Sequence, residues 1–180
     1  GTPKPLIRVA GRALIDHALD IAATAGVGKI VVNLHYLGAQ IEQHLAGRGI
    51  TFSWERDRIL ETGGGLRAAL PLLGPDPVFT MNTDAIWAGP NPLTLLQAHW
   101  NPAEMDALLM CVPPENAAGH TGRGDFTLAE NGALSRGPGQ IYGGIQIIKT
   151  DLLHSIPEAV FSLNLLWNDM LARQRLFGLS

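Results

Sequence analysis

Segments with helical and strand-like patterns alternate along the chain from Ala13 to Val112. Four segments carry apolar residues at helical spacing, and each is followed by a short run of apolar, β-branched or aromatic residues. The expected helices are 13–25, 38–46, 62–70 and 92–100, and the expected strands are 29–34, 50–54, 78–84 and 107–112. This alternation predicts an α/β domain in which a mostly parallel sheet is covered by helices on both faces, a Rossmann-like arrangement of three layers.

The pattern changes after Pro113 and Pro114. Short runs at 125–128 and 141–148 are separated by glycine-rich turns and predict antiparallel strands. Residues 150–156 and 163–173 predict two closing helices. We therefore expect a mixed sheet within one domain that covers residues 1–180.

The composition excludes several classes of function. A net charge of -3 and the absence of any block of basic residues argue against a nucleic-acid or membrane partner held by charge. No apolar stretch is long enough to span a bilayer. The single cysteine, Cys111, lies in an apolar run and is expected to be a small buried residue, which suits a cytoplasmic protein without internal disulfides. The six histidines show no zinc-site spacing, and no serine-hydrolase motif is present.

Asp84 is the first candidate for chemistry. It ends the expected strand that begins at Val78. Ligands of open α/β sheets bind at the carboxyl ends of the strands, so a carboxylate at this position is expected to face a crevice. An acid that starts a turn, or caps the helix near Pro92, would give the same pattern.

Lys4 and the glycine triplet at 63–65 are two further candidates. Pro3 and Pro5 flank Lys4, so we expect an extended backbone outside any helix and an exposed ammonium fixed for phosphate binding. A solvated loop lysine is the alternative. The glycines leave amides open at the start of the helix capped by Thr62, where another molecule can approach closely. A flexible helix entry is the alternative there.

Four segments together resemble the sugar-1-phosphate nucleotidyltransferases, and they occur in the family's order. They are Thr2–Leu6, Leu60–Gly65, Asn82–Asp84 and Gly122–Phe126. The Glu-Thr-Gly-Gly-Gly and Gly-Arg-Gly-Asp-Phe segments are most similar to the N-acetylmuramate-1-phosphate uridylyltransferases. Mannose-1-phosphate guanylyltransferases usually have Gly-Thr-Ala-Gly where this chain has Glu61-Thr62-Gly63-Gly64. The resemblance implies the nucleotide-diphospho-sugar transferase fold.

The resemblance also implies roles for individual residues. Lys4 would contact the nucleotide phosphates as a catalytic residue, and Asp84 would hold a catalytic Mg²⁺. The implied nucleotide contacts further include Asn33, Thr62, Gly63 and Asn82, and the implied sugar-phosphate contacts are Asp125, Gly144 and Asn164. Residues 1–112 would form a nucleotide-binding half, and residues 113–180 a sugar-phosphate-binding half.

The implied activity is Mg²⁺-dependent transfer of a nucleotide from a nucleoside triphosphate, expected to be UTP, to a sugar 1-phosphate, expected to be N-acetylmuramate 1-phosphate. The products would be a nucleotide sugar and pyrophosphate, in cytoplasmic recycling of the cell wall. Three alternatives stay open: a mannose-1-phosphate guanylyltransferase-like enzyme, a non-catalytic regulator that binds sugar nucleotides, and a metal-dependent glycosyltransferase. The last requires paired acids, whereas Asn82-Thr83-Asp84 has one. Both a monomer and a dimer fit the sequence.

Two features of the family are absent from this sequence. The family begins with a strand and a glycine-rich loop that would precede Thr2, and it ends with a second metal-binding Asp beyond Ser180. The first strand would lie beside the strands at 29–34 and 78–84, and its omission would leave an apolar gap. We expect the protein to have further residues at both ends.

Overall fold

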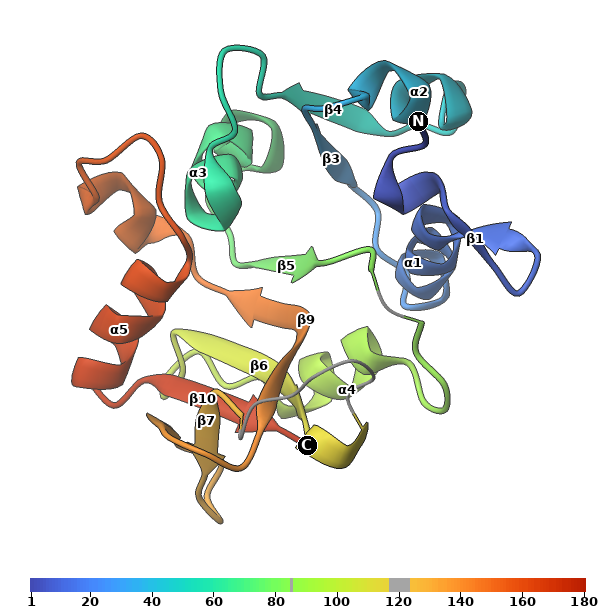
Figure 1. Cartoon of the computed structure of the whole chain (residues 1–180). Helices are drawn as coiled ribbons and strands as arrows, with labels where there is room; N and C mark the ends of the chain where they lie inside the picture. Colours follow the sequence, from blue (N-terminus) through green and yellow to red (C-terminus); the bar gives the residue numbers. More distant parts are fainter. Residues whose placement is uncertain (85, 117–123) are drawn as a thin grey trace. The chain divides into compact units, whose positions relative to one another are not determined.

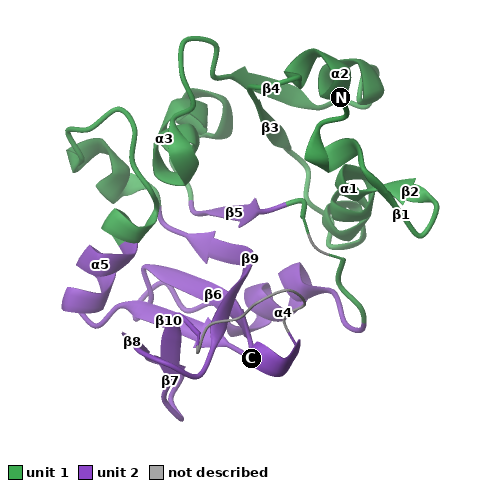
Figure 2. Cartoon of the chain, in the orientation of Figure 1, with its two compact units in different colours: residues 1–76, 83–88, 150–166 green, residues 77–82, 89–149, 167–180 purple. Residues whose placement is uncertain are grey.

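The computed structural model describes residues 1–84, 86–116 and 124–180 (Figure 1). The chain divides into two compact units, coloured separately in Figure 2. Unit 1 comprises Gly1–Asp76, Thr83–Ala88 and Thr150–Leu166, and unit 2 comprises Pro77–Asn82, Gly89–Lys149 and Trp167–Ser180. The chain therefore passes between the units several times, and each unit is built from segments that are distant in sequence.

Unit 1 combines a pair of parallel strands with helices. Its elements are the 3-10 helix η1 (Lys4–Leu6), β1 (Arg8–Val9), β2 (Arg12–Ala13), α1 (Leu14–Thr24), β3 (Val31–Leu34), α2 (Gly38–His44), β4 (Thr51–Trp54), α3 (Glu61–Leu73), the 3-10 helix η3 (Asp151–Ser155) and the start of α5 (Asn164–Ala172). Strands β3 and β4 pair in parallel, with Val31 opposite Thr51 and Leu34 opposite Trp54. Leu34 and Ile41 lie in a buried apolar cluster with residues of α1, so β3, α1 and α2 share one core.

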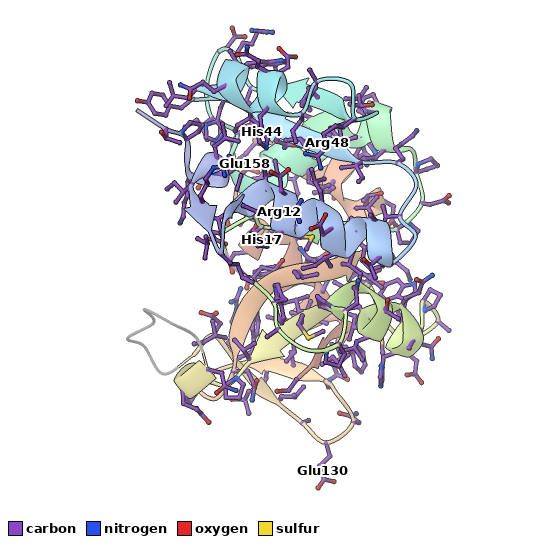
Figure 3. The ribbon with its side chains drawn as sticks, turned by 90° about the vertical axis from the view of Figure 1, so that its right-hand side faces the viewer. Arg12, His17, His44, Arg48, Glu130 and Glu158 are labelled. Carbon is purple, nitrogen blue, oxygen red and sulfur yellow. The ribbon has the colours of Figure 1, made fainter. Side chains whose placement is uncertain are left out.

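A buried acid helps to hold α1 and α2 together. Asp16 on α1 is only 8% exposed, and its carboxylate lies 2.8 Å from His44 Nε2 and accepts from Arg48 Nη1 at 2.5 Å. His44 and Arg48 are labelled in Figure 3. Burial acts to raise the pKa of Asp16, but hydrogen bonds from Arg48 and His44 outweigh it and lower the pKa. The carboxylate therefore stays charged between its two basic partners.

Unit 2 is built on a mixed sheet. Its elements are β5 (Val78–Met81), α4 (Pro92–His99), β6 (Ala107–Val112), the 3-10 helix η2 (Pro114–Asn116), β7 (Phe126–Leu128), β8 (Leu134–Arg136), β9 (Ile141–Ile148), most of α5, and β10 (Leu176–Leu179). The strand order is β10-β6-β9-β5, in which β10 and β6 are parallel and β9 is antiparallel to both neighbours. Strands β7 and β8 form a separate hairpin. Apolar residues of β6 and β9, among them Leu109 and Ile145, are fully buried in this sheet.

The predicted α/β class with a mixed sheet is confirmed, and most of the expected elements occur within a few residues of their predicted ends. The antiparallel strand at 141–148 is confirmed as β9. The expected strand that ends at Asp84 is shorter, because β5 ends at Met81, and its residues are half-buried. The expected helix at 150–156 is the 3-10 helix η3.

Strands β1, β2, β8 and β10 were not predicted. Each is at most four residues long, so none shows a periodic pattern that can be distinguished from a loop. Within the described residues, β3 pairs with β4 alone and β5 with β9 alone. No helix there combines the length and hydrophobicity needed to cross a bilayer.

Candidate functional site

Lys4 opens the 3-10 helix η1. The amides of Leu6 and Ile7 donate to the carbonyls of Pro3 and Lys4, at 2.9 and 3.1 Å. The predicted extended backbone at Lys4 is therefore wrong. A proline at the second position of a helix needs no amide donor there, so Pro5 is compatible with the turn.

Lys4 and Asp84 lie next to each other in unit 1, although eighty positions separate them. The Nζ atom of Lys4 is 3.6 Å from Oδ2 of Asp84, and the two side chains are 67% and 51% exposed. An exposed ion pair of this kind contributes at most about 1 kcal/mol. A ligand that offers each group a better partner can therefore separate the pair at little cost.

Asn33 contacts Glu55, a residue that the sequence analysis missed. Asn33 Nδ2 donates to Glu55 Oε2 at 3.4 Å, while Oε1 of the same carboxylate accepts from the amide of Leu60 at 2.7 Å. A Cβ atom at Gly65 would lie 2.7 Å from Asn33 Nδ2. Glu55 thus ties the end of β3 to the start of α3. Its signal in the sequence is an acid that directly follows the strand at 51–54.

Thr62 and Gly63 lie inside α3 rather than before it, and the predicted cap by Thr62 is wrong. The helix begins at Glu61, and Leu60, which precedes it, makes no side-chain cap. Thr62 Oγ1 instead accepts from the amide of Leu163 at 2.9 Å. The amides of Gly63 and Gly64 both donate to the carbonyl of Phe161, at 3.0 and 3.1 Å, so they are not the open amides that the sequence predicts. Nucleotide contacts at Thr62 and Gly63 stay a prediction.

Asn82, Gly144 and Asp125 gather along β9 in unit 2. The amide of Asn82 donates to the carbonyl of Gly144 at 2.8 Å. Gly144 has a φ of +87°, and a Cβ atom there would lie 3.2 Å from the Asn82 side chain. Asp125 Oδ2 accepts from the amide of Tyr142 at 3.1 Å. Residues 122 and 123, which begin the motif that includes Asp125, lie outside the described residues.

Asn164 is the first residue of α5 and belongs to unit 1. Its backbone amide and its side-chain Nδ2 both donate to Ser162 Oγ, at 3.1 and 3.0 Å. Its side chain is exposed. Of the nine predicted site residues, unit 1 therefore holds Lys4, Asn33, Thr62, Gly63, Asp84 and Asn164.

A hollow of about 350 Å³ lies at the carboxyl ends of β3 and β4. It is lined by His35, Tyr36, Trp54, Glu55, Arg56, Arg58 and Ile59. The Arg56 guanidinium lies 4.2 Å from the centre of the Trp54 ring. Ligands of α/β proteins bind at this edge of a parallel sheet, and the lining here combines aromatic rings with two arginines and the Glu55 carboxylate.

Asp84 offers a half-exposed carboxylate, and its fit to a metal ion is tested by the chemistry of the groups near it. In the part of the chain that the structure describes, no three His, Cys, Asp or Glu side chains are grouped as for a metal site. Mg²⁺ does not need such a group, because it usually binds one or two protein carboxylates and takes its other oxygens from water and substrate phosphates. The half-exposed carboxylate of Asp84 fits that chemistry.

Sequence comparison identifies the family. The family model described as "MobA-like NTP transferase domain" matches residues 1–140. The chain belongs to this family. The N-acetylmuramate alpha-1-phosphate uridylyltransferase of Caulobacter vibrioides is 39% identical over 99% of this chain and 79% of its own length. The enzyme of the same name from Neisseria meningitidis serogroup B is 34% identical over 86% of this chain and 70% of its own length.

Other relatives match a smaller part of the chain or at lower identity. The mannose-1-phosphate guanyltransferase of Gibberella zeae is 36% identical over 47% of this chain and 25% of its own length. Among solved structures, HddC from Yersinia pseudotuberculosis, complexed with GMP-PN, superposes with a TM-score of 0.76. It is 18% identical and covers 99% of this chain and 81% of its own chain, so it shows a shared fold alone. The predicted nucleotidyltransferase fold is thereby confirmed.

Proposed function

We propose that this nucleotidyltransferase joins UTP to N-acetylmuramate 1-phosphate, giving the nucleotide sugar and pyrophosphate, in recycling of the bacterial cell wall. The observation that carries the proposal is the 39% identity to a uridylyltransferase of that specificity over 99% of this chain. The mannose-1-phosphate guanyltransferase of Gibberella zeae matches 47% of the chain, which favours the N-acetylmuramate substrate over mannose 1-phosphate.

The chemistry is an in-line displacement. A phosphate oxygen of the sugar 1-phosphate attacks the α-phosphorus of the triphosphate, and the bond between that phosphorus and the bridging oxygen of the pyrophosphate breaks. The attacking phosphate is already an anion, so no protein base is required. The main barrier is repulsion between two polyanions, and positioned cations lower it. The ammonium of Lys4, 3.6 Å from Asp84, is a cation of this kind.

Lys4 and Asp84 are proposed to offset phosphate charge in two different ways. We assign Lys4 to the triphosphate, where its exposed ammonium offsets charge that builds up on the departing pyrophosphate. We assign Asp84 to Mg²⁺, which when bound neutralises phosphate charge and orients phosphate oxygens. Binding of the triphosphate would replace the Lys4–Asp84 contact with a partner of opposite charge for each group. Asn33, Thr62, Gly63 and Asn82 are proposed to contact the nucleotide, and Asp125, Gly144 and Asn164 the sugar phosphate.

We place the reaction in the cytoplasm, where nucleoside triphosphates are formed. The chain's single cysteine is consistent with a reducing compartment.

Pyrophosphate release tests the proposal. The full-length protein is incubated with Mg²⁺ and each pair drawn from UTP or GTP and N-acetylmuramate 1-phosphate or mannose 1-phosphate. We expect UTP with N-acetylmuramate 1-phosphate to give the highest kcat/KM. Highest activity with GTP and mannose 1-phosphate would establish the guanylyltransferase alternative. Binding of a sugar nucleotide without pyrophosphate release from any substrate pair would establish the regulatory alternative. Either of these two results would refute the proposal.

Variants at the two charged residues test the assigned roles. Asp84→Asn and Lys4→Ala are each expected to lower kcat by about a hundredfold or more, with the fold intact. The matched controls are Asp20→Asn, which removes an acid that is 52% exposed and paired with Arg12, and Lys29→Ala, which removes an exposed lysine. Near-normal turnover in Asp84→Asn or Lys4→Ala would refute that residue's role.

A further inference from the structure

Residues 156–163, called the strap below, lie along the first turns of α3 without regular secondary structure (Figure 1). The amide of Phe161 donates to the carbonyl of Leu60 at 3.2 Å, and the carbonyl of Phe161 accepts from Gly63 and Gly64. The first amides of a helix have no partner within the helix. The strap therefore supplies the acceptor that the start of α3 lacks.

The glycines of α3 are explained by this contact. A Cβ atom at Gly63 would lie 2.3 Å from the Phe161 ring, and one at Gly64 would lie 2.5 Å from the carbonyl oxygen of Ala159. Both distances are shorter than real Cβ atoms allow, so any larger residue would push the strap away from the helix. The glycines thus admit another part of the same chain to the helix backbone.

Arg67, one turn further along α3, holds the other half of the strap. Its guanidinium donates to the carbonyls of Leu153, Ile156 and Glu158, of which the first is at 3.3 Å. The same guanidinium lies 4.8 Å from the centre of the Phe161 ring. A planar fork with five donors suits several carbonyls at once, whereas a lysine offers a single ammonium.

The strap connects two residues with different proposed roles. Thr62, proposed to contact the nucleotide, accepts the amide of Leu163 at 2.9 Å. The next residue, Asn164, is proposed to contact the sugar phosphate, and its amide is held by Ser162 of the strap. The position of Asn164 therefore depends on how the strap is seated on α3.

The geometry points to Arg67 as a positioning residue for the sugar phosphate, acting through the strap and Asn164. This inference rests on the proposed function. Helix α3 is itself packed on the strands, because Leu66, Ala69 and Leu70 are buried and Gly65 contacts Asn33. Pro157, Glu158 and Ala159 of the strap are exposed, whereas Phe161 and Leu163 are buried. Loss of Arg67 therefore frees residues 156–159 and removes the guanidinium from the Phe161 ring, which loosens the seating of the strap and leaves α3 in place.

Steady-state kinetics of Arg67→Ala test this inference, with the two substrates varied separately. We expect the KM for the sugar 1-phosphate to rise about tenfold or more, since hydrogen bonds from a charged group are lost, and the KM for the triphosphate to change less than about twofold. Arg67→Lys keeps one charged donor and is expected to give an intermediate KM. The control is Arg8→Ala, which removes another arginine that donates to a backbone carbonyl in unit 1, that of Gly11.

Gly63→Ala provides a second route to the same displacement. We expect it to raise the KM for the sugar 1-phosphate, and we expect Phe161→Leu, which removes the ring that the new Cβ atom meets, to restore part of that KM in the double variant. Amide hydrogen exchange at Phe161 and Leu163 should quicken in both Arg67→Ala and Gly63→Ala. This exchange is measured without substrates.

Three outcomes would overturn the inference. An unchanged KM for the sugar 1-phosphate in Arg67→Ala would show that the strap does not position this substrate. Equal increases in the KM values for the sugar 1-phosphate and the triphosphate in Arg67→Ala would show a general loss of structure. If the wild-type protein releases no pyrophosphate from any substrate pair, the proposed function fails and the inference fails with it. An active wild type whose variants have unchanged KM values refutes the inference alone.

Discussion

Asp106 lies among three basic side chains at the start of β6, and its replacement should selectively destabilise unit 2. Its side chain is 7% exposed; Oδ1 accepts from Arg175 Nε at 2.8 Å and lies 3.3 Å from Lys149 Nζ. Oδ2 is 3.0 Å from Arg173 Nη1 but lacks the alignment of a hydrogen bond. The carboxylate thereby joins the start of β6 to the end of β9 and to the residue before β10.

Asp106→Asn keeps the size of the side chain and one acceptor oxygen but removes the charge. Breaking a buried ion pair typically costs about 3–5 kcal/mol. The three basic partners are 25–41% exposed, so water can hydrate them once the carboxylate is gone. We therefore expect a smaller loss, about 2–3 kcal/mol, in the free energy of unfolding. Asp169→Asn is the matched control, because Asp169 is 52% exposed and pairs with the same Arg173. Its expected loss is below about 0.5 kcal/mol.

The difference between wild type and Asp106→Asn should depend on pH. Burial acts to raise the pKa of Asp106, but hydrogen bonds from Arg175 and Lys149 and the nearby positive charges outweigh it and lower the pKa. A carboxyl group with a lowered pKa stabilises the folded state above its unfolded pKa, about 3.9, and loses that contribution as the pH falls through its folded pKa. The difference should be constant from about pH 5 to 7 and should shrink below about pH 4.

Urea unfolding followed by circular dichroism, at pH 7, 5 and 3, measures this difference. Asp106→Asn and Asp169→Asn that are equally stable at pH 7 would refute the assigned energy of the cluster. A difference between wild type and Asp106→Asn as large at pH 3 as at pH 7 would refute the lowered pKa.

Two further predictions concern β6 and β9. Gly144→Ala should lower the free energy of unfolding, measured in urea, by about 1–2 kcal/mol, because φ is +87° there and the new Cβ atom would lie 3.2 Å from Asn82. The control Gly28→Ala places a Cβ atom in open space at an ordinary φ, and we expect little change. Cys111 should resist iodoacetamide at pH 8 until urea unfolds the chain. Burial, with a smaller effect of the Asp125 charge, raises the pKa of its thiol to about 12, so little reactive thiolate is present. Rapid labelling of the folded protein would contradict this prediction.

Continuous apolar runs were the part of the fold that the sequence predicted best. The strand expected at 107–112 is β6 with the same ends, and its first five residues are buried. Strands that are buried on both faces are continuously apolar, so a short run of this kind indicates a central position in a sheet. Strand β10, Leu176–Leu179, was missed although Leu176 is buried, because four residues that include a glycine carry no pattern of their own. Its pairing with β6 is decided by tertiary contact.

The glycine triplet shows why the candidate site was harder to predict. Locally, Gly63–Gly65 resemble a loop that admits a ligand, but Gly63 and Gly64 admit Phe161 and Ala159, almost a hundred positions later, and Gly65 admits Asn33. A glycine indicates that another group lies close to the backbone, but it does not identify that group as a ligand or as part of the same chain. Glu55 was missed for a related reason, because its partners Asn33 and Leu60 become visible only when β3, β4 and α3 are packed together.

The contact between Lys4 and Asp84 gives physical meaning to the prolines that surround Lys4. An ammonium on a flexible loop would lose conformational freedom on binding phosphate, and that loss would weaken the interaction. Pro3 and Pro5 restrict the backbone of η1 from which the Lys4 side chain extends, and its ammonium lies 3.6 Å from the Asp84 carboxylate without any ligand bound. Because both side chains are largely exposed, their mutual attraction is weak. Under the roles proposed above, Asp84 would keep Lys4 near the triphosphate without competing strongly against it, so the pair would favour substrate binding rather than stability.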